Sequence, residues 1–89
     1  MGQLDYRYIS ERMAAAEAGK ADALYDLGLL YATGQGVDID LVEAHKWFNL
    51  ASVRGIRRAL IDRAELARDM SPAEVAEAQR QAREWLSCH

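Results

Sequence analysis

The sequence predicts an all-α protein built from short helices that pack in pairs. Of its 89 residues, 51% are hydrophobic and only one is proline, and no alternating run of Val, Ile or Thr indicates strands. Apolar residues instead recur at the spacing of one helix face. The pattern of Ala15–Leu24 returns 36 residues later at Ala51–Leu60. A repeat of this length, with two helices in each unit, is typical of an α-solenoid.

Five helices are expected along the chain. Glycines at Gly19, Gly34, Gly36 and Gly55 separate the first four helices, because glycine readily adopts the backbone angles at which helices end. The expected helices cover residues 4–18, residues 21–33, a segment from Asp40 to Gly55, residues 56–69 and residues 71–87. A chain of this length accommodates one domain, and we expect residues 1–89 to form it.

Two of these helices have clear start signals. Asp40 and Glu43 have the spacing of a capping box, in which each side chain bonds the backbone N–H of the other residue, and so do Ser71 and Glu74. Pro72 follows at the first helical position, where its missing N–H costs nothing. We expect the last helix to act as a cap that shields the helix before it.

Charge and composition exclude several classes of partner and location. The net charge is −3 and the pI is about 5.3, so nucleic acid is not an expected partner. The sequence contains no run of 18 apolar residues, which is about the length needed to cross a membrane. The single cysteine, Cys88, cannot form a disulfide within the chain, which favours a reducing compartment and hence the cytoplasm.

No pattern indicates catalysis, cofactor binding or metal binding. Gly34 and Gly36 lie between two expected helices, where a turn is favoured over a phosphate-binding loop. Cys88 and His89 are adjacent at the end of the chain and His45 is far away, which is not metal-ligand spacing. We interpret the last two residues as a frayed tail and expect no enzyme activity.

The segment 21–55 resembles the SEL-one-like repeat (SLR), a relative of the tetratricopeptide repeat. The resemblance is carried by Leu27-Gly28-x-x-Tyr31, Gly34-x-Gly36-Val37 and Ala44-x-x-Trp47. It implies an α/α superhelix in which one full repeat is flanked by half repeats at 4–19 and 56–69. We assign core or turn roles to its repeat positions, which are Leu24, Leu27, Gly28, Tyr31, Gly34, Gly36, Val37, Ala44, Trp47, Ala51 and Gly55.

The resemblance also implies a concave surface that binds a protein or peptide partner and is lined by the first helix of each pair. The candidate groove residues are Asp22, Tyr25, Asp26, Leu29, Arg58, Ile61 and Glu65. Two alternatives stay open at this point. Asp22 and Asp26 suit the positive end of their own helix as well as a basic partner. Tyr25 and Leu29 could also be covered by the first helix.

A second hypothesis is self-association. The first helix has no preceding partner in the repeat pattern, so we expect Tyr6, Tyr8 and Ile9 to be only partly covered. Pairing of these surfaces in a homodimer would bury apolar area that so short a chain cannot cover by itself.

Overall fold

The computed structural model describes residues 6–89, which form five helices and no strand. The helices are α1 (Tyr6–Glu17), α2 (Ala21–Thr33), α3 (Leu41–Val53), α4 (Arg58–Ala67) and α5 (Pro72–Cys88). The predicted all-α class is confirmed. The expected start of the first helix, at residue 4, lies outside the described residues.

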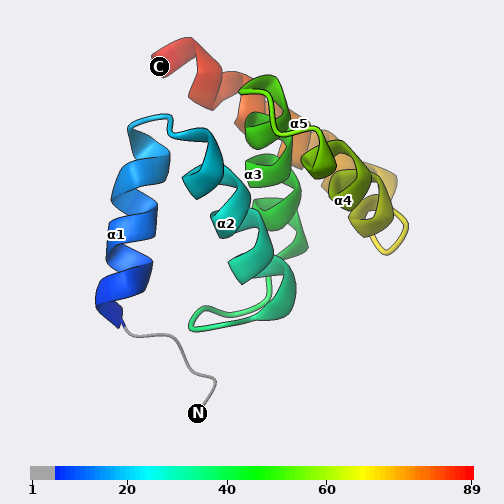
Figure 1. Ribbon diagram of the computed structural model, residues 1–89. Coiled ribbons are helices and arrows are strands. Elements are labelled where there is room, and N and C mark those ends of the chain that lie inside the picture. The colour runs from blue at the N-terminus through cyan, green and yellow to red at the C-terminus, as the bar shows by residue number, and fades with distance from the viewer. Residues whose placement is uncertain (1–5) are drawn as a thin grey trace.

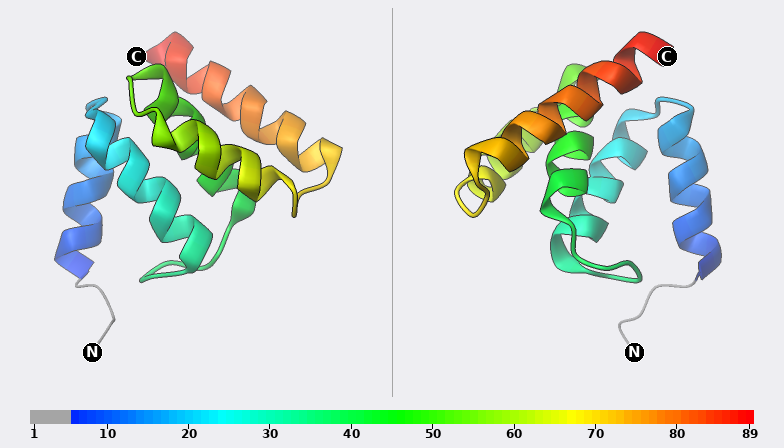
Figure 2. Two further views of the ribbon diagram at one scale, coloured as in Figure 1. Left: turned by 45° about the vertical axis from the view of Figure 1, so that its right-hand side comes forward. Right: turned by 180° about the vertical axis from the view of Figure 1, so that it is seen from behind.

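Helix α3 is the central element of the fold. It packs against α2, α4 and α5, whereas α1 packs against α2 (Figure 1). The two further views show α2 and α4 on one side of α3 and α5 on the other (Figure 2). The architecture is a short α/α solenoid in which α1 packs on one side of the α2–α3 hairpin and α4 and α5 pack on α3.

Helix α5 lies mainly against α3, so the prediction that it shields α4 was wrong. The small buried residues Ala78 and Ala82 line its inner face. Trp85 meets Trp47 of α3 edge-on, with ring centroids 6.4 Å apart. This aromatic contact adds apolar surface to the interface between α5 and α3.

The two capping signals have different outcomes. Ser71 forms the full capping box, in which its Oγ accepts a bond from the Glu74 N–H and the Glu74 carboxylate accepts one from the Ser71 N–H. Asp40 accepts a bond from the Glu43 N–H, but the Glu43 carboxylate does not return it. Glu43 instead accepts a bond from Trp47 Nε1 at 2.9 Å, which fixes the orientation of that indole.

The core is thin and rich in alanine. Seven of the fifteen buried hydrophobic residues in the described chain are alanines, so helix axes can approach closely. Ile9 is only 6% exposed, which corrects the expectation that it is partly uncovered. Of the repeat positions, Leu24, Leu27, Gly28, Ala44, Trp47 and Ala51 are buried, Tyr31 and Val37 are half-buried against the core, and Gly34, Gly36 and Gly55 have positive φ.

The closest approach of α2 to α3 is at Gly28. A Cβ atom on this residue would overlap the ring of Phe48, which is itself buried. The missing side chain therefore allows the Phe48 ring to lie directly on the α2 backbone.

This contact predicts the effect of a single added methyl group. Gly28→Ala should lower the free energy of unfolding by about 1–3 kcal/mol, because α2 and α3 must separate or the Phe48 ring must leave its rotamer. Urea denaturation followed by circular dichroism measures the change. Adding Phe48→Leu to the same variant should recover part of the loss, since the smaller side chain can yield. Unchanged stability of Gly28→Ala would contradict the packing argument.

Candidate functional site

A shallow groove of about 250 Å³ lies between α2 and α4, with α3 beneath it. Its apolar part is formed by Ala32, the buried Phe48 and the half-buried Leu66. Its acidic part is formed by Asp62, Glu65 and Asp69, whose spacing places them on one face of α4 and its C-terminal extension. We call this surface, lined by these six residues, the α2–α4 groove.

Tyr25 connects the two helices that form the groove. Its hydroxyl donates a hydrogen bond to Asp62 Oδ2, and its ring packs on Phe48 with centroids 5.5 Å apart. Burial, followed by the hydrogen bond to Asp62, raises the pKa of the Tyr25 hydroxyl above its usual value, so it remains a donor at neutral pH. The Arg58 side chain lies 3.9 Å from the same carboxylate. The Tyr25–Asp62 bond thus joins α4 to α2, while α4 packs mainly on α3.

Two of the predicted groove residues face α1. Arg12 Nη1 lies 2.7 Å from Asp26 Oδ2 and 3.9 Å from Asp22 Oδ2. The hydrogen bond to Asp26 raises the pKa of Arg12. These two carboxylates therefore interact with the neighbouring helix, whereas the groove lies on the side of α2 that faces α4.

The other predicted residues lie nearer the groove. Leu29 is one helical turn from Tyr25 and is 40% exposed, so it lies at the rim on the α2 side. Glu65 lines the groove directly. Ile61 is 59% exposed and precedes the lining residues on α4. Of the open alternatives, the structure therefore has Tyr25 packed toward α4 and Leu29 at the surface.

Sequence reasoning missed the lining residues Phe48, Asp62, Leu66 and Asp69. A signal for Asp62 was present, because the 36-residue repeat aligns it with Asp26. The others depend on the angle between α2 and α4, which no local pattern encodes.

Comparison with known proteins identifies the hairpin that forms one side and the floor of this groove. The family model of the Sel1 repeat matches residues 21–55, which comprise α2 and α3. The chain contains a Sel1 repeat. Repeats of this family mediate protein–protein interactions. A comparison with curated proteins gave no match.

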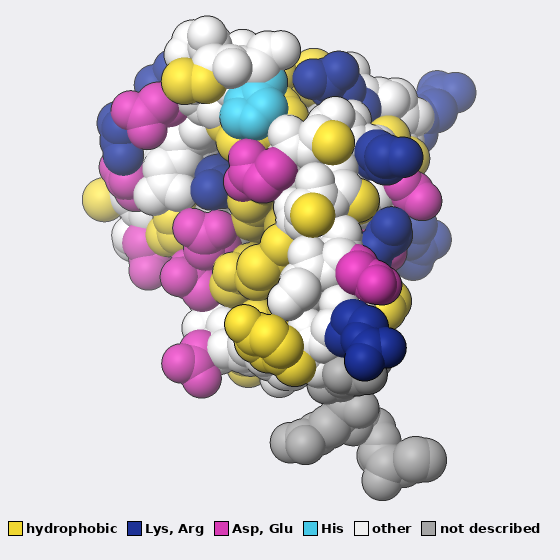
Figure 3. All heavy atoms as spheres, turned by 90° about the vertical axis from the view of Figure 1, so that its left-hand side faces the viewer, with side chains coloured by type: hydrophobic (Ala, Val, Ile, Leu, Met, Phe, Trp, Pro, Cys, Tyr) yellow, Lys and Arg dark blue, Asp and Glu magenta, His cyan; other side chains and the backbone are white. Residues whose placement is uncertain are grey.

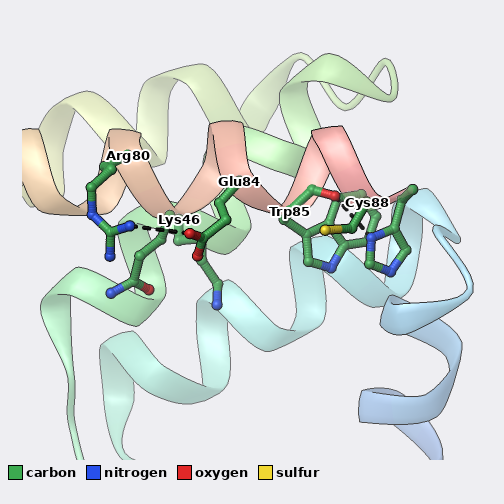
Figure 4. A pocket seen from close by; sticks show the side chains of 7 residues that line it. Lys46, Arg80, Glu84, Trp85 and Cys88 are labelled. Atoms are coloured by element: carbon green, nitrogen blue, oxygen red, sulfur yellow. Dashed lines mark hydrogen bonds and ion pairs between the residues drawn. The ribbon is translucent and has the colours of Figure 1, made fainter.

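A second depression lies where α5 passes over Lys46 of α3. Figure 4 shows Arg80 and Glu84 reaching toward each other along one side of it, 3.3 Å apart, with Trp85 nearby. Arg80 also bonds Glu77, whose pKa it lowers to about 2. Because Arg80 is paired with Glu84 and Glu77, the depression has fewer charged groups available to a ligand than the α2–α4 groove.

The end of the chain is ordered by contacts, and the interpretation of a frayed tail was wrong. The His89 ring stacks on Trp85 with centroids 3.7 Å apart, and its Nε2 lies 3.3 Å from Glu17 of α1.

His45 is buried, and burial lowers its pKa. Within residues 6–89, no group of three His, Cys, Asp or Glu side chains could hold a metal ion. None of the helices there is long and apolar enough to cross a membrane.

The bond between Tyr25 and Asp62 can be tested by removing a single oxygen. Tyr25→Phe should lower the free energy of unfolding by about 1 kcal/mol, because it deletes the hydrogen bond and keeps the ring on Phe48. Hydrogen exchange should become faster in α4. Tyr31→Phe is the matched control, since the Tyr31 hydroxyl has no hydrogen-bond partner among residues 6–89. Equal effects of the two variants would show that the bond contributes nothing to holding α4.

Proposed function

We propose that this chain is a small interaction module that binds a peptide or helix of a partner protein in the α2–α4 groove. The observation that carries this proposal is the groove itself. It has an apolar floor, it lies between the first helix of the Sel1 repeat and the helix that follows the repeat, and it has exposed apolar side chains beside it. The proposal treats residues 1–89 as one domain in which α1 and α4 are half repeats.

The groove suits an elongated partner better than a small molecule. It is open along its length, and Leu29 and Ile61 extend its apolar surface on the α2 and α4 sides. A partner segment lying across both helices would cover these two side chains together with the floor, as helices do in apolar grooves. No catalytic role is part of the proposal. A reducing location such as the cytoplasm is part of it, since Cys88 is a free and exposed thiol.

The proposal predicts that altering the groove removes partner binding without unfolding the protein. Leu29→Ser combined with Ala32→Gln should reduce capture of the partner from host lysate by about tenfold, because it removes a rim contact and fills the floor. Quantitative mass spectrometry of the captured proteins measures the loss.

The matched control for this variant lies on the opposite side of α4. Leu60→Ser combined with Ala64→Gln makes the same chemical changes at exposed positions that do not line the groove. Circular dichroism must show that both variants are folded. If the same proteins are captured equally by the groove variant and by the control, the groove is not the binding surface.

The second candidate function is self-association through α1. Tyr6 is 82% exposed and Tyr8 is 40% exposed. Figure 3, which views the molecule from the side of α1, shows a band of hydrophobic side chains running down this face. A second copy of the chain that covered this band would bury apolar area in the way that homodimer interfaces do.

Self-association predicts a mass that depends on concentration. Sedimentation equilibrium of the wild type should give a dimer at high micromolar concentration, and Tyr6→Ser with Tyr8→Ser should give a monomer. Ile9 is left unchanged in this test because it belongs to the core. A wild-type monomer across the whole concentration range would exclude this candidate.

A further inference from the structure

We infer that the α2–α4 groove binds a positively charged protein segment, in which Lys or Arg side chains flank an apolar one. This inference rests on the proposed function and specifies the chemistry of the partner. It is based on the charges along one face of α4, on their position at the end of that helix and on the apolar floor beside them.

The groove carries negative charge that the protein does not neutralise. Asp62 is engaged by Tyr25 and Arg58. Glu65 and Asp69 are exposed, and neither forms an ion pair with any of residues 6–89. Two carboxylates on one wall of an open groove are therefore available to cations from a partner.

The position of these carboxylates is unfavourable for the free protein. Helix α4 ends at Ala67, and its last turn contains Glu65 and no basic residue. Asp69 follows two residues later. Negative side chains at this end of a helix interact unfavourably with the exposed carbonyl groups, which carry partial negative charge. Arg68, the C-cap residue, forms no ion pair with either carboxylate within the described chain. A cation bound here would reduce the repulsion that Glu65 and Asp69 each experience from these carbonyl groups.

The apolar floor determines the rest of the partner. Ala32, Phe48 and Leu66 lie beside the acidic wall, so a cationic side chain alone would leave them in contact with water. A segment that places an aliphatic or aromatic side chain on this floor, with Lys or Arg beside it, satisfies both surfaces. The Leu29 rim can accommodate the aliphatic part of a long basic side chain.

The test uses a phage-displayed library of random peptides about 12 residues long, which is long enough for anchors at positions i, i+3, i+4 and i+7 of a groove-binding helix. The library is selected in parallel against the wild type and against the Glu65→Gln/Asp69→Asn variant. We expect the wild type to enrich peptides with Lys or Arg next to a large apolar residue and the variant to lose this enrichment. Glu11→Gln/Asp38→Asn is the matched control, because it makes the same change in charge at exposed positions outside the groove.

Enriched peptides are then measured by fluorescence anisotropy. The Kd should rise about tenfold in the Glu65→Gln/Asp69→Asn variant, as expected for the loss of two partly exposed charge pairs, and should stay unchanged in the control. It should also rise between about 50 and 500 mM NaCl. The same variant should melt at an equal or higher temperature than the wild type, since it removes the repulsion at the end of α4. Weaker binding therefore cannot be attributed to unfolding.

The outcomes separate this inference from the proposed function. The charge inference would be overturned by enriched peptides that depend on Leu29 and Ala32 but are neutral or acidic. It would also be overturned if such peptides bound the Glu65→Gln/Asp69→Asn variant as tightly as the wild type. Either result would leave the groove as a binding site. A selection that yields no peptide dependent on the groove residues would overturn both.

Discussion

The contact between Gly28 and Phe48 is the constraint on which the rest of the structure depends. Because Gly28 has no side chain, the Phe48 ring lies on the α2 backbone and brings α2 and α3 together. The same ring then supports Tyr25 and forms the floor of the α2–α4 groove. Tyr25 in turn bonds Asp62 and so joins α2 to α4. One aromatic side chain thus links the packing of the repeat to the geometry of its candidate binding surface.

The two ends of this short solenoid are held by polar and aromatic contacts as well as by apolar burial. Chains of this size bury a smaller fraction of their surface than larger domains do, so few apolar residues remain for the ends. Arg12 joins α1 to α2 through Asp26. The α5 end is joined to α1 through the stacked pair of Trp85 and His89, with His89 beside Glu17. Such contacts add less stability than a larger core would, but they orient the terminal helices.

The sequence was sufficient to predict the helices and the repeat, because periodicity, glycines and caps are local signals. It was not sufficient to predict how Asp62 and α5 are placed. The repeat aligns Asp62 with Asp26 and Phe48 with Arg12, the partner of Asp26. Since Phe48 is uncharged, it cannot form an ion pair with Asp62 as Arg12 does with Asp26, and Asp62 instead accepts a hydrogen bond from the Tyr25 hydroxyl. This exchange of partners depends on the relative positions of three helices. The docking of α5 on α3 likewise depends on long-range packing.

The shallowness of the groove limits what its floor can contribute to binding. Burying one apolar side chain contributes about 1.5–3 kcal/mol, whereas association of two molecules costs at least about 4 kcal/mol in lost freedom of motion. A partner that touched only Phe48, Ala32 and Leu66 would therefore bind very weakly. Measurable affinity requires contacts on both sides, with Leu29 on α2 and the acidic wall on α4. The partner segment consequently has to lie across both helices, whose relative position depends on their packing on α3 and on the Tyr25–Asp62 bond.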